Sequence, residues 1–148
     1  MYFNDFTPGQ RFRAGSHTIT EAEIIAFAMD YDPQLFHTNP EAAAKSIYGG
    51  LIASGFQTAL IAFRMVVDAN IWTQSSQGSP GIENLRWFKP VRPGDRLDVV
   101  LEVVDTRPSS RRDDRGYVTW DYIVSNQHDE TVCQWRSTII TLVAPPTD

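Results

Sequence analysis

An aspartate and a histidine lie five residues apart in the segment Asp32-Pro-Gln-Leu-Phe-His37. A carboxylate and an imidazole held near one water molecule can remove a proton from it and return a proton to a substrate, which is general acid–base chemistry. Burial beside Leu35 and Phe36 would raise the pKa of Asp32, whereas a nearby imidazolium would lower it, and the sequence leaves this balance open. The spacing alone also fits an Asp32 that caps a turn and a His37 that satisfies a buried carbonyl.

The other two histidines are expected at the surface. His17 falls in a polar segment, and His128 stands in a turn beside Asp129 and Glu130. Adjacent residues in a turn do not converge into a closed shell of metal ligands, so we expect no metal site there. The residues indicate no cofactor either.

Helix ends are predicted to position the segment that carries Asp32. Thr20-Glu-Ala-Glu23 has the form of a capping box, in which each side chain bonds the backbone amide of the other residue. The helix that begins there should end before Pro33, because the residue before a proline avoids the helical region. Asp32 is therefore offered from a helix end. Asn39 and Pro40 then predict a second, short helix start.

A third helix is predicted to begin at Ser54, as its N-cap, and to run to about Ala69. It is apolar on most sides, which is typical of a central, buried helix. Residues 11–18 predict an edge strand, and from Ile82 onward apolar and polar residues alternate as in strands. The pattern predicts an α+β fold, with an antiparallel β-sheet around one long helix in a single domain over residues 1–148. One sheet face then stays partly apolar, so a homodimer is expected.

Composition narrows the partners. The chain of 148 residues has a formal net charge of −5, which argues against nucleic acid as the main partner. Its one cysteine, Cys133, allows no intrachain disulfide and fits a reducing compartment. The N-terminal residues lack a secretory signal pattern, and no apolar stretch is long enough to span a bilayer. We therefore expect a cytoplasmic protein without a membrane segment.

Several motifs carry a family resemblance. The stretch FAMDYDPQLFHTNPEAA at residues 27–43 resembles the hydratase motif of MaoC-like dehydratases and (R)-specific enoyl-CoA hydratases, in which a histidine follows an aspartate by five residues. GLIASG at residues 50–55 looks like the entry into the central helix of that family. WFKPVRPGD at residues 87–95 is similar to the strand and turn that follow this helix. With YFNDF at residues 2–6 and the Gly9-Gln10 pair, the resemblance covers nearly the whole chain.

The resemblance implies a hotdog fold, usually dimeric, and reversible addition of water to a trans-2-enoyl-CoA. Asp32 and His37 would hold and activate the water. The thioester oxygen gains negative charge during the reaction and needs hydrogen-bond donors. Ser54 and Gly55 are the candidate substrate-binding residues, because unpaired amides at a helix N-terminus suit that task. Close packing of the helix on the sheet would explain Gly55 nearly as well.

This sequence also departs from the family pattern. Ser54-Gly55 stands where many members have His-Gly, and Phe63 stands near the position of a serine in the (R)-hydratases. Coenzyme A carries phosphates, so Arg86, Lys89 and Arg92 are candidates to bind it, although a solvated loop explains this cluster equally well.

The sequence also allows two functions other than hydration. A hotdog thioesterase would use a carboxylate to direct water at the thioester carbonyl. A non-catalytic acyl-CoA-binding subunit would explain the bulky Phe63, since that residue alters the expected acyl pocket.

Overall fold

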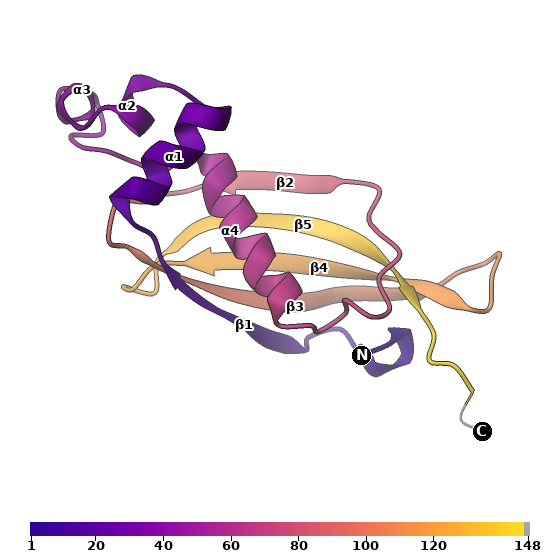
Figure 1. The fold of residues 1–148 in the computed structure, drawn as a ribbon. Helices are drawn as coiled ribbons and strands as arrows, with labels where there is room; N and C mark the ends of the chain where they lie inside the picture. The colour runs from indigo at the N-terminus through magenta and orange to yellow at the C-terminus, as the bar shows by residue number, and fades with distance from the viewer. Residues whose placement is uncertain (147–148) are drawn as a thin grey trace.

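An antiparallel sheet curves around one side of a long helix, and three short helices gather beyond one end of the sheet (Figure 1). The computed structural model describes residues 1–146. Within this range the sheet has five strands in the order β1-β3-β4-β5-β2. The elements are the 3-10 turn η1 (Phe3–Asp5), β1 (Arg11–Thr18), α1 (Glu21–Tyr31), α2 (Leu35–Thr38), α3 (Pro40–Ala44), α4 (Gly55–Asp68), β2 (Ile82–Trp87), β3 (Arg96–Pro108), β4 (Arg115–Ser125) and β5 (Thr131–Leu142).

The sequence predictions for these elements are largely confirmed. The sheet is antiparallel throughout the described strands, the fold is α+β, and β1 is an edge strand. The other edge is β2, whose pairing with β5 is interrupted by an irregularity between Glu83 and Arg86. Both edges therefore carry backbone groups that no further strand within residues 1–146 pairs with.

The short helices are shaped by their caps. The Thr20 hydroxyl accepts from the Glu23 amide at 3.2 Å, and a Glu23 carboxylate oxygen accepts from the Thr20 amide at 2.7 Å, which confirms the capping box. Asp32 is the C-cap of α1, as Pro33 predicts. The Asn39 side chain accepts from the Ala42 amide at 3.0 Å and begins α3. The one-turn helix α2, which carries His37, lies between Pro33 and Asn39 and was not predicted from the sequence.

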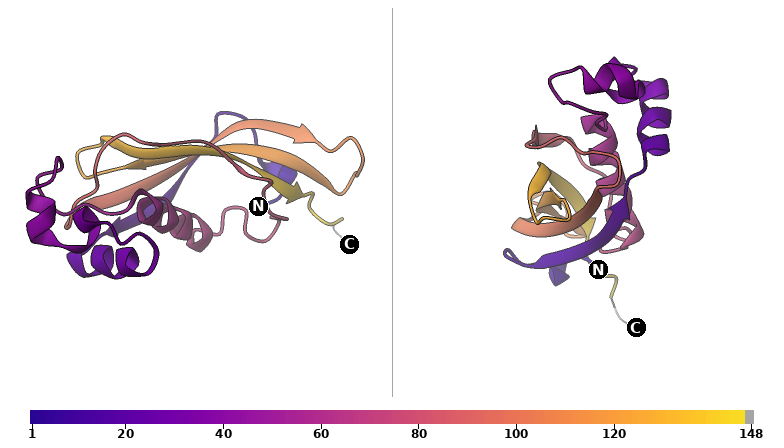
Figure 2. Two further views of the ribbon diagram at one scale, coloured as in Figure 1. Left: turned by 90° about the horizontal axis from the view of Figure 1, so that it is seen from above. Right: turned by 90° about the vertical axis from the view of Figure 1, so that its left-hand side faces the viewer.

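The core lies between α4 and the inner face of the sheet. One face of α4 is buried through Ala62, Met65 and Val66. It packs on alternating residues of the central strands, among them the large side chains Trp120 and Tyr122. Figure 2 shows the sheet curling toward this helix in two further views. The alternation predicted from the sequence therefore selects the residues that fill the core.

The prediction that α4 is a central, buried helix holds for one of its faces only. Its opposite face exposes large apolar side chains beside apolar residues at the two ends of the edge strand β2. Because Phe63 is 41% exposed and Trp87 is 44% exposed, this surface is far less covered than the core. We call it the α4–β2 patch, and its members are Phe56, Leu60, Phe63, Ile82, Trp87 and Phe88.

No helix within residues 1–146 is both long enough and apolar enough to cross a membrane.

Candidate active site

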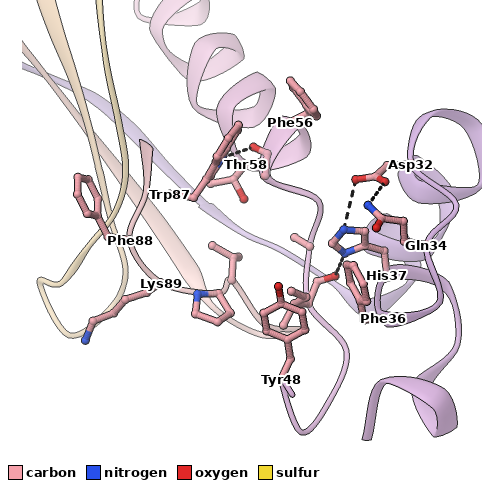
Figure 3. Close-up of a pocket in the computed structure, with 15 residues that line it drawn as sticks. Asp32, Gln34, Phe36, His37, Tyr48, Phe56, Thr58, Trp87, Phe88 and Lys89 are labelled. Carbon is pink, nitrogen blue, oxygen red and sulfur yellow. Dashed lines mark hydrogen bonds and ion pairs between the residues drawn. The ribbon is translucent and has the colours of Figure 1, made fainter. Parts of the chain in front are cut away.

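Asp32 and His37 point toward one another, as Figure 3 shows. Asp32 Oδ2 lies 3.3 Å from His37 Nε2, and the two side chains are 19% and 6% exposed. Asp32 comes from the end of α1 and His37 from α2, so the turn at Pro33 brings the pair together. The predicted acid–base pair thus has its two groups in contact.

The His37 ring is fixed by a second contact on its far side. Nδ1 lies 2.7 Å from the backbone carbonyl oxygen of Ile52. A carbonyl only accepts hydrogen bonds, so Nδ1 must carry the hydrogen, and the lone pair of the neutral ring is then on Nε2. The edge of the ring also contacts Phe36, with centroids 4.5 Å apart. The lone pair of Nε2 therefore lies on the side of Asp32, where one water molecule could donate to both groups.

Two neutral side chains donate hydrogen bonds to the Asp32 carboxylate. Gln34 Nε2 donates to Oδ1 and the Ser54 hydroxyl donates to Oδ2, each at 2.7 Å. Burial raises the pKa of Asp32, but these two hydrogen bonds and the His37 imidazole together outweigh burial, so the pKa lies below its ordinary value. This settles the balance that the sequence left open, and Asp32 is a carboxylate near neutral pH.

The pair stands at the wall of a cavity of about 570 Å³. The cavity lies between α1–α2, the start of α4 and the end of β2, and five aromatic side chains form part of its wall (Figure 3). A volume of this size is typical of small-molecule sites. Its aromatic lining residues are Phe36, Tyr48, Phe56, Trp87 and Phe88.

Gly55 lies in this cavity at the N-terminus of α4. Its N–H is one of the amides that a helix start leaves without an intrahelical acceptor, and no acceptor within residues 1–146 pairs with it. The Trp87 indole lies directly over Gly55: a Cβ added there would come within 2.5 Å of two ring atoms. The indole N–H also donates to the Gly55 carbonyl oxygen at 2.8 Å. Close packing therefore requires a glycine here, and its amide has no partner among residues 1–146.

Ser54 has a different task from the one the sequence suggested. It occupies the N-cap position of α4, but its side chain makes no capping hydrogen bond. Its hydroxyl is fully buried, lies outside the lining of the cavity and donates to Asp32. The sequence analysis missed this contact and that of Gln34. No local sequence pattern links Ser54 to Asp32, because the two residues are 22 positions apart.

The three basic residues proposed for coenzyme A separate in the structure. Lys89 lines the cavity and pairs with Glu130. Arg92 is exposed and donates to the Tyr48 carbonyl oxygen, so it braces a loop at the edge of the site. Arg86 is exposed on β2 and does not line the cavity.

The remaining histidines take no part in this site. His128 is exposed in the turn before β5, as predicted. His17 is only half-exposed, and its Nε2 lies 3.0 Å from Glu23 Oε1. The prediction that it lies at the surface was therefore only partly correct. Among residues 1–146, no group of three or more His, Cys, Asp or Glu side chains is arranged to hold a metal ion.

Comparison with known proteins agrees with this architecture. The MaoC like domain family matches residues 4–127. The uncharacterized protein YdeM of Bacillus subtilis is 30% identical over 140 residues, which span 95% of this chain and 98% of that protein. The crystal structure of a MaoC-like dehydratase from Rhodospirillum rubrum superimposes with a TM-score of 0.93 at 37% identity, covering 99% of each chain.

A more distant structure supports the fold alone. The unliganded R-hydratase PhaJ1 from Pseudomonas aeruginosa has a TM-score of 0.77 at 23% identity, over 99% of this chain and 95% of that one. The predicted hotdog fold is confirmed by these structures. From the family match together with the full-length likeness to the Rhodospirillum rubrum structure, we conclude that the chain belongs to the MaoC-like dehydratase family.

Proposed function

We propose that this protein catalyses the reversible hydration of a trans-2-enoyl-CoA, with Asp32 and His37 as the groups that activate water. The observation that carries the proposal is the contact between Asp32 Oδ2 and His37 Nε2 at 3.3 Å, in the wall of a cavity large enough for a thioester. Within general acid–base catalysis, such a positioned pair contributes about 10²–10⁴-fold to the rate.

The two groups would have different roles. Asp32 stays ionised, so it accepts a hydrogen bond from the water and does not supply a proton. Neutral His37 takes a proton at Nε2 while the water oxygen bonds to the β-carbon of the substrate. The electron pair of the double bond shifts to the α-carbon and the thioester oxygen. The Nε2–H of His37, stabilised by Asp32, then protonates the α-carbon, so both hydrogens of the water end on the substrate.

The developing charge on the thioester oxygen requires a donor. The Gly55 amide is our candidate, because it is free, lines the cavity and stands at the positive end of the α4 dipole. Ser54 would act on the substrate only through Asp32. Of the basic residues, Lys89 is the one that the cavity wall supports for a phosphate of coenzyme A.

The exposed α4–β2 patch supports a homodimer as part of this proposal. Apolar side chains on one helix and on a neighbouring free strand edge are typical of an interaction surface. The occupant we propose is the same patch of a second copy, because a two-fold axis lets one apolar surface cover itself.

The experiment is a turnover assay with enoyl-CoA thioesters of different chain lengths, followed by loss of the absorbance of the conjugated thioester. A parallel assay for free thiol separates hydration from thioester hydrolysis. Hydration of at least one thioester without thiol release is the expected result. Thiol release without hydration would instead identify a thioesterase.

A further inference from the structure

Thr58 carries a buried hydroxyl that the mechanism above does not use. The residue lies in the first turn of α4 and is 2% exposed, yet it lines the cavity that contains Asp32 and His37. Figure 3 shows its side chain pointing from α4 into this cavity, beside Trp87. A polar side chain therefore stands in the cavity wall close to the N-terminus of α4.

The Thr58 hydroxyl forms no hydrogen bond with any residue in the range 1–146, in contrast to its polar neighbours on α4. The Ser54 hydroxyl donates to Asp32, and the Gln57 side-chain amide donates to the backbone carbonyl of Glu23. A threonine in a helix often donates to the carbonyl four residues earlier. Here the Ser54 carbonyl accepts from the Thr58 amide at 3.1 Å and not from its hydroxyl.

This free hydroxyl is open to the cavity. Its oxygen is not enclosed by protein, as the unpaired Oε1 of the adjacent Gln57 is. Buried polar groups in proteins are nearly always hydrogen-bonded, and the exceptions often belong to functional sites. The Thr58 hydroxyl is therefore suited to a partner that enters the cavity.

The geometry of a helix directs this hydroxyl toward the Gly55 amide. Thr58 follows Gly55 by three residues, and residues three apart lie on the same side of a helix. Because each Cα–Cβ bond tilts toward the helix N-terminus, the Thr58 side chain covers the turn that begins at Gly55. The amide and the hydroxyl are thus two donors at the N-terminus of α4, where the helix dipole also favours negative charge.

An enoyl thioester needs such donors away from the groups that activate water. Its β-carbon and its carbonyl oxygen are the two ends of one conjugated unit, so water attacks at one end while negative charge develops at the other. Asp32 and His37 come from the end of α1 and from α2, whereas Gly55 and Thr58 come from α4. All four residues line the same cavity, so the two pairs can act on the two ends of one substrate.

We propose that the Thr58 hydroxyl donates a hydrogen bond to the thioester oxygen, as a second donor beside the Gly55 amide. This assignment rests on the proposed hydration and adds a catalytic residue to it. Thr58 keeps its proton throughout: its hydrogen bond strengthens as charge moves onto the oxygen and weakens when His37 protonates the α-carbon. Because the hydrogen bond is strongest in the transition state, Thr58 acts on kcat more than on KM.

Three substitutions in the whole chain test this role by turnover. Thr58→Val removes the hydroxyl and keeps the shape and a similar helix propensity, whereas Thr58→Ser keeps a hydroxyl. Thr141→Val is the matched control, because it removes a buried hydroxyl that donates to the Ile139 carbonyl and does not line the cavity. Loss of one such donor typically lowers kcat by about 10²–10³-fold, so Thr58→Val should show a loss of this size with little change in KM. Thr58→Ser and Thr141→Val should keep most of the wild-type kcat.

A measurement without turnover separates this role from a structural one. The carbonyl stretch of a ¹³C-labelled thioester, followed by difference infrared spectroscopy, moves to lower frequency when the oxygen accepts hydrogen bonds. Butyryl-CoA and decanoyl-CoA are saturated and cannot be hydrated. Their bound carbonyl stretch should lie at higher frequency in Thr58→Val than in the wild type, and should be unchanged in Thr141→Val. Thermal unfolding should find Thr58→Val as stable as the wild type, because its hydroxyl has no protein partner to lose.

A Thr58→Val variant that hydrates an enoyl-CoA at the wild-type kcat would overturn the proposal. So would an equal carbonyl frequency in Thr58→Val and the wild type, a marked loss of stability in this variant, or no binding of either saturated thioester. A carbonyl frequency that depends on Thr58, in a protein that hydrates no enoyl-CoA, would keep the hydrogen bond and contradict the proposed function.

Discussion

The Ser54 hydroxyl donates to Asp32 Oδ2 at 2.7 Å and ties the start of α4 to the end of α1. Asp32 lines the cavity, whereas Ser54 has no solvent exposure and does not line it. The bond holds the carboxylate beside His37 and helps to keep it ionised. Ser54 is therefore a positioning residue, which acts on the substrate only through Asp32.

Removing this hydroxyl should raise the pKa of Asp32. Ser54→Ala removes one of the hydrogen bonds that lower this pKa, so the Asp32 carboxyl should titrate at higher pH in ¹³C-resolved NMR. The plateau of kcat/KM should fall about tenfold or more, since a hydrogen bond to a charged group is worth roughly 1.5–3 kcal/mol. Ser16→Ala on β1, outside the Asp32 cavity, is the control. An unshifted Asp32 pKa would contradict this role.

The neutral His37 ring should exist as one tautomer. Because Nδ1 donates to the Ile52 carbonyl, ¹⁵N-resolved NMR should find the hydrogen on Nδ1 and the lone pair on Nε2. His128, which is exposed in a turn, provides an internal comparison without such a constraint. Finding the hydrogen of neutral His37 on Nε2 would remove the proposed base.

Gly55→Ala should destabilise the fold through Trp87. The new Cβ would come within 2.5 Å of the indole, and overpacking of this kind typically costs about 1–3 kcal/mol. The double variant Gly55→Ala with Trp87→Ala should recover much of the free energy of unfolding, measured by chemical denaturation. Gly81→Ala is the matched control, because a Cβ there meets nothing within 4 Å. A Gly55→Ala variant as stable as the control would show that the packing constraint is absent.

If the α4–β2 patch forms a dimer, one charged substitution in it should lower the molar mass of the protein in solution. Ile82→Asp places a charge in the α4–β2 patch and should convert the dimer into a monomer in light scattering after size-exclusion chromatography. Ile47→Asp changes an even more exposed isoleucine outside the patch, and should leave the mass unaltered. A wild-type chain that elutes as a monomer would refute the dimer itself.

The sequence was sufficient for features that depend on neighbouring residues. The capping box at Thr20, the proline that ends α1 and the alternation in the strands are local patterns, and each appears in the structure as predicted. The pairing of Asp32 with His37 could also be predicted from the sequence, because a proline turn and the family motif lie within the same segment.

The features that the sequence did not reveal depend on distant parts of the chain. Ser54 meets Asp32 across 22 residues, and Trp87 meets Gly55 across 32. The exposed face of α4 was mistaken for core because an apolar surface that awaits a partner has the same composition as a buried one.

The central claim is tested most directly by the hydration rates of Asp32→Asn and His37→Gln on an enoyl-CoA that the wild-type protein turns over. Each substitution keeps the approximate size of the side chain and removes its acid–base function, so each should lower kcat by about 100-fold or more while the protein stays folded. Full rates in both variants would contradict the assignment of Asp32 and His37 as the groups that activate water.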